Sequence, residues 1–365
     1  MTHKFSLIIL LWLLLLSPQL AACGERNYVL KHSGFSASTQ QQPVFWLDND
    51  RVIFTGHQVF PEKKRKDADP LLEQGIYIWD TRNNHVDNFA KDASLGCYFQ
   101  GYIRYRVGLE AKKGLMGKER TYVTWTEDRK YTYVQETWKG EPPESHDQQE
   151  VRSHRITCRS YKPRGMPADY VELLPEHGYL SFKFSLLEPP PGPSMPITWY
   201  RPGASEGTKL PLTYAQVNSG LVYYLEFVQA YLLYSHNYFD PVTGRDSADW
   251  PKELPKVFWL MKPDGTVTTH QVPNIYGSWR HVRPLRHGVF GFGGVGSVGK
   301  IPRNPGNAGA YWIDGDHAHR LSAGLVNIMA VSPDGCKVAF VNEPHDELPM
   351  RDRVTLHALD VCLGG

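Results

Sequence analysis

The chain has 365 residues, and 40 Lys and Arg face 38 Asp and Glu, which gives a formal net charge of +2. A charge so near zero excludes a global field that would draw the protein to nucleic acid or to anionic lipid, so we expect no nucleic-acid partner. The 20 Tyr, 10 Trp, 32 Gly and 27 Pro favour many short strands and turns over long helices.

The first 22 residues are typical of an export signal. Lys4 precedes the apolar run Phe5–Leu16, and the small residues Ala21 and Ala22 follow it. This run is too short for a membrane-spanning helix, which needs about 20 apolar residues. We therefore predict a signal peptide over residues 1–22.

Leu20-Ala21-Ala22-Cys23 resembles the lipobox of bacterial lipoproteins. The resemblance implies that Cys23 is diacylated and becomes the first residue of the mature chain, a stable membrane anchor. Gly24, rather than Asp, follows it. In a Gram-negative host this implies an outer-membrane lipoprotein that faces the periplasm. The alternative is ordinary cleavage after Ala22, which would leave Cys23 unmodified.

Without Cys23, four cysteines remain, and they allow three disulfide pairings in an oxidising compartment. Cys336 begins one expected strand and Cys362 ends the next, so a hairpin would place them opposite each other. Cys97 would then pair with Cys158. Metal binding is the rival interpretation, but the sequence has no C-x-x-C spacing. Two structural disulfides are the better prediction.

Residues 23–42 are expected to form a lipidated tether, in which Asn27–Leu30 could be a strand. From Pro43 onward hairpins follow one another. The first two are predicted at Val44–Leu47 with Arg51–Thr55, and at Ile76–Trp79 with His85–Phe89.

An aromatic-rich strand then recurs along the chain. Its copies are Ile76–Trp79, Thr121–Trp125, Ile197–Tyr200, Val257–Leu260, Ala310–Ile313 and Arg353–Leu359. Units of roughly 45–60 residues with about four strands each are typical of a β-propeller. The stretch Ser332–Phe340 also resembles the WD40-like repeat of TolB-type propellers. We therefore predict an all-β fold, a β-propeller over residues 43–365, with six blades, or seven if Val151–Leu180 hides another.

The last unit, from Ile328 onward, has only three predicted strands before the chain stops. An open edge strand invites aggregation, so the missing strand is expected to come from elsewhere in the chain. We predict that Asn27–Leu30 supplies it and thereby closes the ring.

The sequence has no catalytic or cofactor motif in the structural context that its chemistry requires, so we predict no catalytic residues, no metal and no cofactor. Gly291–Gly296 matches G-x-G-x-x-G, but Pro302 and Pro305 exclude the helix that a phosphate site requires. No G-x-S-x-G occurs, and the 15 histidines lack metal-ligand spacing.

The longest connections all fall between the second and third strand of a unit. They are Gly56–Gly75, Gly108–Glu119, Ser235–Pro255, Gly293–Gly309 and Asn342–Arg351. Insertions at the same point of each repeat project from one face, which is often the binding face. The binding-face candidates are His57, Lys64, Arg65, His236, Tyr238, Asp240, Arg245, Trp250, Arg303, His345 and Arg351.

This mixture of aromatic, basic and polar side chains suits contact with protein or glycan. The alternative is that variable loops simply accumulate on a permissive face. The sequence thus supports a cell-envelope lipoprotein whose propeller recognises another envelope protein. The competing hypothesis is a periplasmic propeller enzyme that acts on a sugar or small metabolite at the axial mouth.

Overall fold

The computed structural model describes residues 27–37, 44–58, 74–91, 93–99, 102–107, 119–126, 134–139, 170–181, 195–217, 222–235, 238–240, 245–247, 254–274, 281–293, 308–343 and 355–363. Across these residues the regular elements are strands and two short 3-10 turns, without an α-helix. All strand pairs whose register is known are antiparallel. The predicted all-β fold is confirmed.

The described strands form six four-stranded units, which we number in chain order. Unit 1 contains β2 (Phe45–Trp46), β3 (Arg51–Gln58), β4 (Gly75–Asp80) and β5 (His85–Lys91). Unit 2 contains β6 (Ala93–Phe99), β7 (Tyr102–Val107), β8 (Glu119–Thr126) and β9 (Val134–Lys139). Unit 3 contains β10 (Tyr170–Glu172), β11 (Tyr179–Ser181), β12 (Pro196–Tyr200) and β13 (Thr208–Thr213).

The remaining units repeat this order. Unit 4 contains β14 (Val222–Leu225), β15 (Ala230–Tyr234), β18 (Lys256–Met261) and β19 (Val267–Val272). Unit 5 contains β20 (His281–Pro284), β21 (Val289–Gly293), β22 (Gly309–Asp314) and β23 (His317–Ala323). Unit 6 contains β24 (Leu325–Val331), β25 (Lys337–Glu343), β26 (Thr355–Asp360) and β1 (Val29–Ala37).

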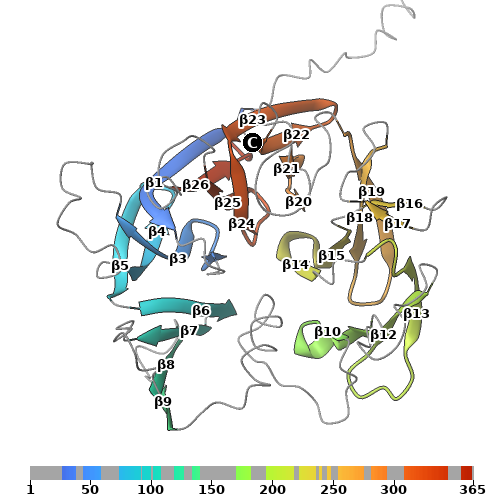
Figure 1. Ribbon diagram of the computed structural model, residues 1–365, viewed down its shortest axis with the longest axis horizontal. Helices are drawn as coiled ribbons and strands as arrows, with labels where there is room; N and C mark the ends of the chain where they lie inside the picture. The colour runs from blue at the N-terminus through green and yellow to red at the C-terminus, as the bar shows by residue number, and fades with distance from the viewer. Residues whose placement is uncertain are drawn as a thin grey trace, which may run out of the picture.

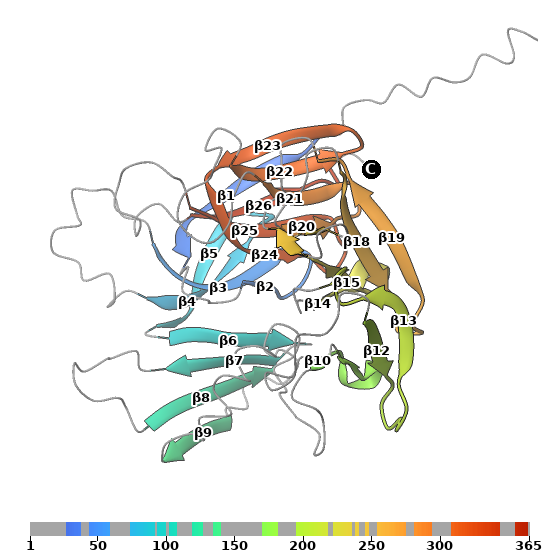
Figure 2. The ribbon, with the colours of Figure 1, turned by 45° about the vertical axis from the view of Figure 1, so that its right-hand side comes forward.

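The units follow one another around a common centre, and the first strands β14, β20 and β24 lie nearest that centre (Figure 1). Figure 2 shows the four strands of unit 2 side by side, from β6 to β9. The recurring aromatic strands of the sequence are the third strands of the units, β4, β8, β12, β18, β22 and β26. The predicted hairpins at Arg51 and at His85 are likewise present.

The N-terminal strand β1 joins the last unit to the first. Val29 and Leu30 pair with Asp360 and Leu359 of β26, which confirms the predicted strand. The same strand then continues to Ala37 and pairs with β3, so units 6 and 1 form one continuous sheet. Gly34 has φ +75° between the two pairings, a left-handed conformation that glycine adopts without steric cost. The strand therefore changes partners at a glycine.

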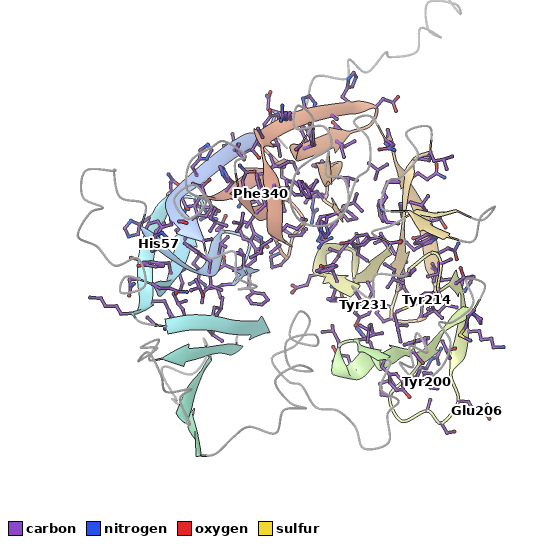
Figure 3. All side chains as sticks on the ribbon, in the orientation of Figure 1. His57, Tyr200, Glu206, Tyr214, Tyr231 and Phe340 are labelled. Carbon is purple, nitrogen blue, oxygen red and sulfur yellow. A yellow bond between two sulfur atoms is a disulfide. The ribbon has the colours of Figure 1, made fainter. Side chains whose placement is uncertain are left out.

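Apolar side chains fill the space between successive units, because strand residues alternate between two faces and both faces of these sheets are covered. One cluster joins Leu173 and Trp199 of unit 3 to Tyr231 and Trp259 of unit 4. Similar clusters join units 1 and 2, 4 and 5, 5 and 6, and 6 and 1. Figure 3 shows this filling, with Tyr231 and Phe340 among the labelled core residues.

In units 3 and 5 a third-strand tryptophan binds a turn of its own unit. The indole N–H of Trp199 donates to the carbonyl of His177 at 2.8 Å, and that of Trp312 donates to the carbonyl of His287 at 3.0 Å. In both units the acceptor lies in the turn between the first and second strand. A buried indole N–H needs such a partner. The recurrence of Trp in the sequence thus has a structural cause.

Candidate functional site

The prediction that the longest connections all fall between second and third strands is wrong, because residues 140–169, from β9 of unit 2 to β10 of unit 3, form a longer one. The five predicted connections do lie between second and third strands. They run from β3 to β4, from β7 to β8, from β15 to β18, from β21 to β22 and from β25 to β26. Antiparallel strands alternate in direction, so the end of a second strand and the start of a third strand meet at one edge of the sheet. We call this the long-connection edge. The opposite edge, where the short turns lie, is the turn edge.

Four of the predicted binding-face residues lie in described elements. His57 lies within β3 and pairs with Ser36 of β1, so the first connection begins after Gln58 and His57 is a strand residue. The connection from β15 to β18 contains a hairpin of β16 (Tyr238–Asp240) and β17 (Arg245–Ser247). In this hairpin Asp240 pairs with Arg245.

The other predicted site residues fall outside what the structure describes. They are Cys23, Lys64, Arg65, Cys158, His236, Trp250, Arg303, His345 and Arg351, together with the side chain of Cys97.

A buried arginine lies within β20, where it pairs with Phe290, and its contacts extend to the long-connection edge of unit 5. Arg283 of β20 is 3% exposed, and its guanidinium carbon lies 3.7 Å from the ring centroid of Tyr223 in unit 4. Its Nη1 donates to the hydroxyl of Tyr234 at 3.1 Å and to the carbonyl of Val282 at 2.8 Å. The same Tyr234 hydroxyl lies 3.0 Å from Nδ1 of His281. A cation, two stacked tyrosines and an imidazole therefore form one cluster between units 4 and 5.

Burial shapes the protonation of this cluster. Burial of Tyr234 raises the pKa of its phenol well above the ordinary value, although the neighbouring Arg283 opposes that rise. Burial also works against the charge on Arg283, but the two tyrosines outweigh it and raise the pKa of the guanidinium. The phenols are thus neutral acceptors at neutral pH and the guanidinium is charged.

A second buried base lies at the same edge. Lys256 begins β18 and is 0% exposed, and its ammonium donates to the carbonyl of Ser235, which follows the last residue of β15. Burial lowers the pKa of Lys256 to about 7. Units 4 and 5 thus each carry one buried basic side chain, and Lys256 lies where the long connection of unit 4 ends.

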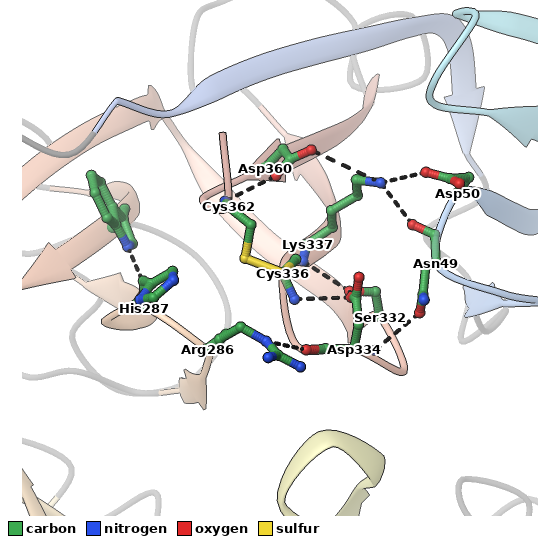
Figure 4. The surroundings of a disulfide bond; sticks show 11 residues. Asn49, Asp50, Arg286, His287, Ser332, Asp334, Cys336, Lys337, Asp360 and Cys362 are labelled. Atoms are coloured by element: carbon green, nitrogen blue, oxygen red, sulfur yellow. Dashed lines mark hydrogen bonds and ion pairs between the residues drawn. A yellow bond between two sulfur atoms is a disulfide. The ribbon is translucent and has the colours of Figure 1, made fainter. Parts of the chain in front are cut away.

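The turn edge holds a different polar network, which joins units 1 and 6. Lys337 donates to the carbonyl of Asn49 at 2.8 Å and to the carboxylate of Asp50 at 2.6 Å. The backbone N–H of Asp334 donates to the side chain of Asn49 at 3.0 Å, and Arg286 of unit 5 donates to the Asp334 carbonyl at 2.9 Å. Figure 4 shows these bonds around the turn Ser332–Lys337.

The same turn carries the disulfide between Cys336 and Cys362, with 5.3 Å between the Cα atoms. This pairing is the one that the sequence predicts. A depression of about 350 Å³ lies beside the network and is lined by Asp48, Asn49, Asp50, Arg51, Asp80, Arg82 and Asn83.

The acidic side chains of this depression are bound by other parts of the chain. Burial opposes ionisation of Asp48, but the N–H groups of Asp50 and Arg51 and the Arg51 guanidinium lower its pKa below the ordinary value. Asp50 binds both Arg82 and Lys337. The depression is therefore part of the joint between units.

Within the described ranges no group of three or more His, Cys, Asp or Glu side chains could hold a metal ion. Nor does any helix there have the length and apolar character needed to cross a bilayer.

Sequence reasoning missed Arg283 and Lys256. Neither belongs to a motif. Lys256 begins an apolar strand beside a long connection, which is a usable signal, whereas Arg283 lies among other basic residues, Arg280 and Arg286, and nothing in the sequence distinguishes it from them.

No protein-family model matches the chain, and no curated protein matches it. A chain of the structure described as "Crystal Structure of Mitotic Checkpoint Complex" is similar at 9% identity and a TM-score of 0.36, over 92% of this chain and 94% of that chain.

Two archaeal structures are also similar. The Pyrococcus horikoshii acylaminoacyl peptidase shows 10% identity and a TM-score of 0.22 over 87% of this chain, which spans 38% of the peptidase. The β-propeller domain of the Trilobed protease from Pyrococcus furiosus shows 9% identity and a TM-score of 0.21, over 87% of this chain and 66% of that one. Likenesses this distant carry no argument about function. The fold of this chain is defined by its own strand pairing and by the apolar clusters between its units.

Proposed function

We propose that this protein is a lipid-anchored, six-bladed β-propeller of the bacterial cell envelope that recognises another envelope protein. The observation that carries the proposal is the common position of the long connections, between the second and third strands of five units. In a ring of such units these connections project from one face, which is the usual place for partner contacts in repeat proteins.

The six-bladed ring is supported by the order of the units and by β1. Apolar clusters join units 1 and 2 and, in succession, units 3, 4, 5, 6 and 1, whereas no cluster of described residues joins units 2 and 3. The last unit takes its outer strand from the N-terminus, where His32 pairs with His357. A ring completed in this way leaves unit 6 without an open edge.

The lipid anchor is supported by the lipobox residues Leu20–Cys23 and by the short distance from there to the body of the protein. Val29, the first residue of β1, is the sixth residue after Cys23. Even fully extended, this segment spans at most about 20 Å. The propeller would therefore stay close to the membrane, where an envelope partner is accessible.

Lipidation is tested by fatty-acid labelling of the wild type and of Cys23→Ser in the producing bacterium. We expect label in the wild type alone. Equal labelling of both proteins would remove the anchor from the proposal.

Recognition is tested by photo-crosslinking in the intact envelope. A photoreactive residue replaces Arg245 in the β16–β17 hairpin, and Asn83, in the β4–β5 turn at the turn edge, is the matched control position. We expect a discrete crosslinked protein from position 245 and none from position 83. No product from position 245, or the same product from both positions, would contradict a recognition surface at the long-connection edge.

A further inference from the structure

Arg283 is a buried charge without a counter-ion among the described residues. A guanidinium stays protonated at all physiological pH values, and burying a charge is costly unless it is paired. The groups that act on its pKa are Tyr223 and Tyr234, which are neutral phenols, and no carboxylate is among them. Its positive charge is therefore delocalised over aromatic faces but not neutralised by any described group.

The hydrogen-bonding capacity of Arg283 also exceeds what surrounds it. A guanidinium carries five N–H donors. The described acceptors are the Val282 carbonyl and the Tyr234 hydroxyl, with the Tyr223 hydroxyl beside them. Arg283 has no side-chain atom that is both sealed from solvent and without a hydrogen bond. The spare N–H groups of Arg283 are thus not shut off from solvent.

The surroundings hold the guanidinium in a fixed plane. Tyr223 covers one face of it, and Tyr234 fixes Nη1 and stacks on Tyr223 with 6.4 Å between the ring centroids. A planar, pre-oriented guanidinium suits bidentate binding of a carboxylate or a phosphate.

The location suits access from one side. β20 is the first strand of unit 5 and lies toward the common centre of the units (Figure 1). His281, which opens β20, pairs with Phe292 next to the end of β21, so this end of β20 is at the long-connection edge. Lys256 adds a second buried base at the same edge.

We propose that Arg283 binds an anionic group, a carboxylate or a phosphate, which reaches it from the long-connection edge near the centre of the ring of units. This inference rests on the proposed function, because it gives the chemistry of the group that the recognition face accepts. The spare donors bind the anion, Tyr223 and Tyr234 position them, and the anion supplies the missing counter-charge.

The test is calorimetric titration of the full chain, purified in detergent, with sodium phosphate and separately with sodium acetate, against sodium chloride at equal ionic strength. We expect one of the two anions to bind and chloride not to. Arg283→Lys keeps the charge but loses the planar fork, and we expect it to bind the anion roughly ten- to hundredfold more weakly. Arg201→Lys is the matched control, because Arg201 also lies over an indole, at 5.0 Å from the Trp199 ring centroid, but outside the cluster.

A second measurement covers the case in which Arg283→Lys does not fold. In the wild type, the bound anion should slow amide exchange in the peptide that contains β20 and leave the peptide that contains β12 unchanged. Binding of neither anion, equal affinity of wild type and Arg283→Lys, or unchanged exchange at β20 would overturn the inference. A protein that still crosslinks from position 245 but binds no anion would lose this inference and keep the proposed function.

Discussion

Acidification should weaken the contact that joins the two ends of the chain, because a buried histidine lies in it. His357 of β26 is 6% exposed and pairs with His32 of β1, with 4.6 Å between the imidazole centroids. Its Nε2 lies 2.6 Å from the hydroxyl of Thr355, its ring stacks on Phe340, and its Nδ1 is buried without a partner. Burial, and secondly the neighbouring His32, lower the pKa of His357 from 6.5 to about 4.

The lowered pKa means that the unfolded chain binds a proton more readily than the folded one. The contribution of His357 to stability is therefore fully present above pH 6.5 and is lost as the pH falls toward 4. At pH 5 the loss is about 2 kcal/mol, and it approaches about 3 kcal/mol below pH 4.

The assay is urea unfolding of the wild type and of His357→Phe at pH 7.5 and at pH 5. The phenylalanine keeps an aromatic ring against Phe340 but cannot titrate. We expect the difference in unfolding free energy between the two pH values to be about 2 kcal/mol smaller in the variant. His85→Gln, at an exposed side chain, is the control and should leave the difference unchanged. An equal pH dependence in wild type and His357→Phe would refute the reasoning.

Three further perturbations test the joints between units. Gly335→Ala places a Cβ 2.4 Å from the ring of Phe227, whereas Gly315→Ala meets nothing within 4 Å, and both glycines have positive φ. In both variants the alanine has a left-handed backbone conformation, which costs about 1–2 kcal/mol. In urea unfolding we expect the unfolding free energy of Gly335→Ala to fall by about 1–3 kcal/mol more than that of Gly315→Ala. Equal losses would contradict the close packing of Gly335 against Phe227. Cys336→Ala removes the disulfide that closes a loop with a sequence separation of 26, and we expect the unfolding free energy to fall by about 3 kcal/mol. Added reductant should lower the unfolding free energy of the wild type but not that of the variant. Because burial lowers the pKa of Lys256 to about 7, the wild type should gain stability as the pH rises from 7 to 10, and Lys256→Met should lack this gain. An equal gain in both proteins would contradict the lowered pKa.

Local signals in the sequence predicted much of the fold. The turns at Asp48-Asn49-Asp50 and at Ser332–Gly335 contain short polar residues whose side chains bind nearby backbone N–H groups, and both form. The recurring Trp positions marked the third strands of several units, and in units 3 and 5 the indole binds the turn between the first two strands.

Other features depend on partners that are distant in the sequence. β1 was expected to pair with the last unit, but its continuation to Ala37 and its second pairing with β3 were not, because Ser36–Gln42 is polar and simple in composition. The cluster around Arg283 was missed for a similar reason. Tyr223, Tyr234 and Arg283 come from three strands, and only their tertiary contact gives the arginine a possible role in binding.

The pairing of the first strand with the last one has a consequence for the order of events during synthesis. Val29 finds its partner Asp360 only after almost every later residue has been synthesised. Until then unit 6 lacks its outer strand and β1 lacks its partner in β26, a state that favours association with other chains. Contacts of such long sequence separation also slow folding. Any factor that protects the growing chain should therefore act on the N-terminal strand, and truncation at the C-terminus should be more harmful than the loss of a few residues suggests.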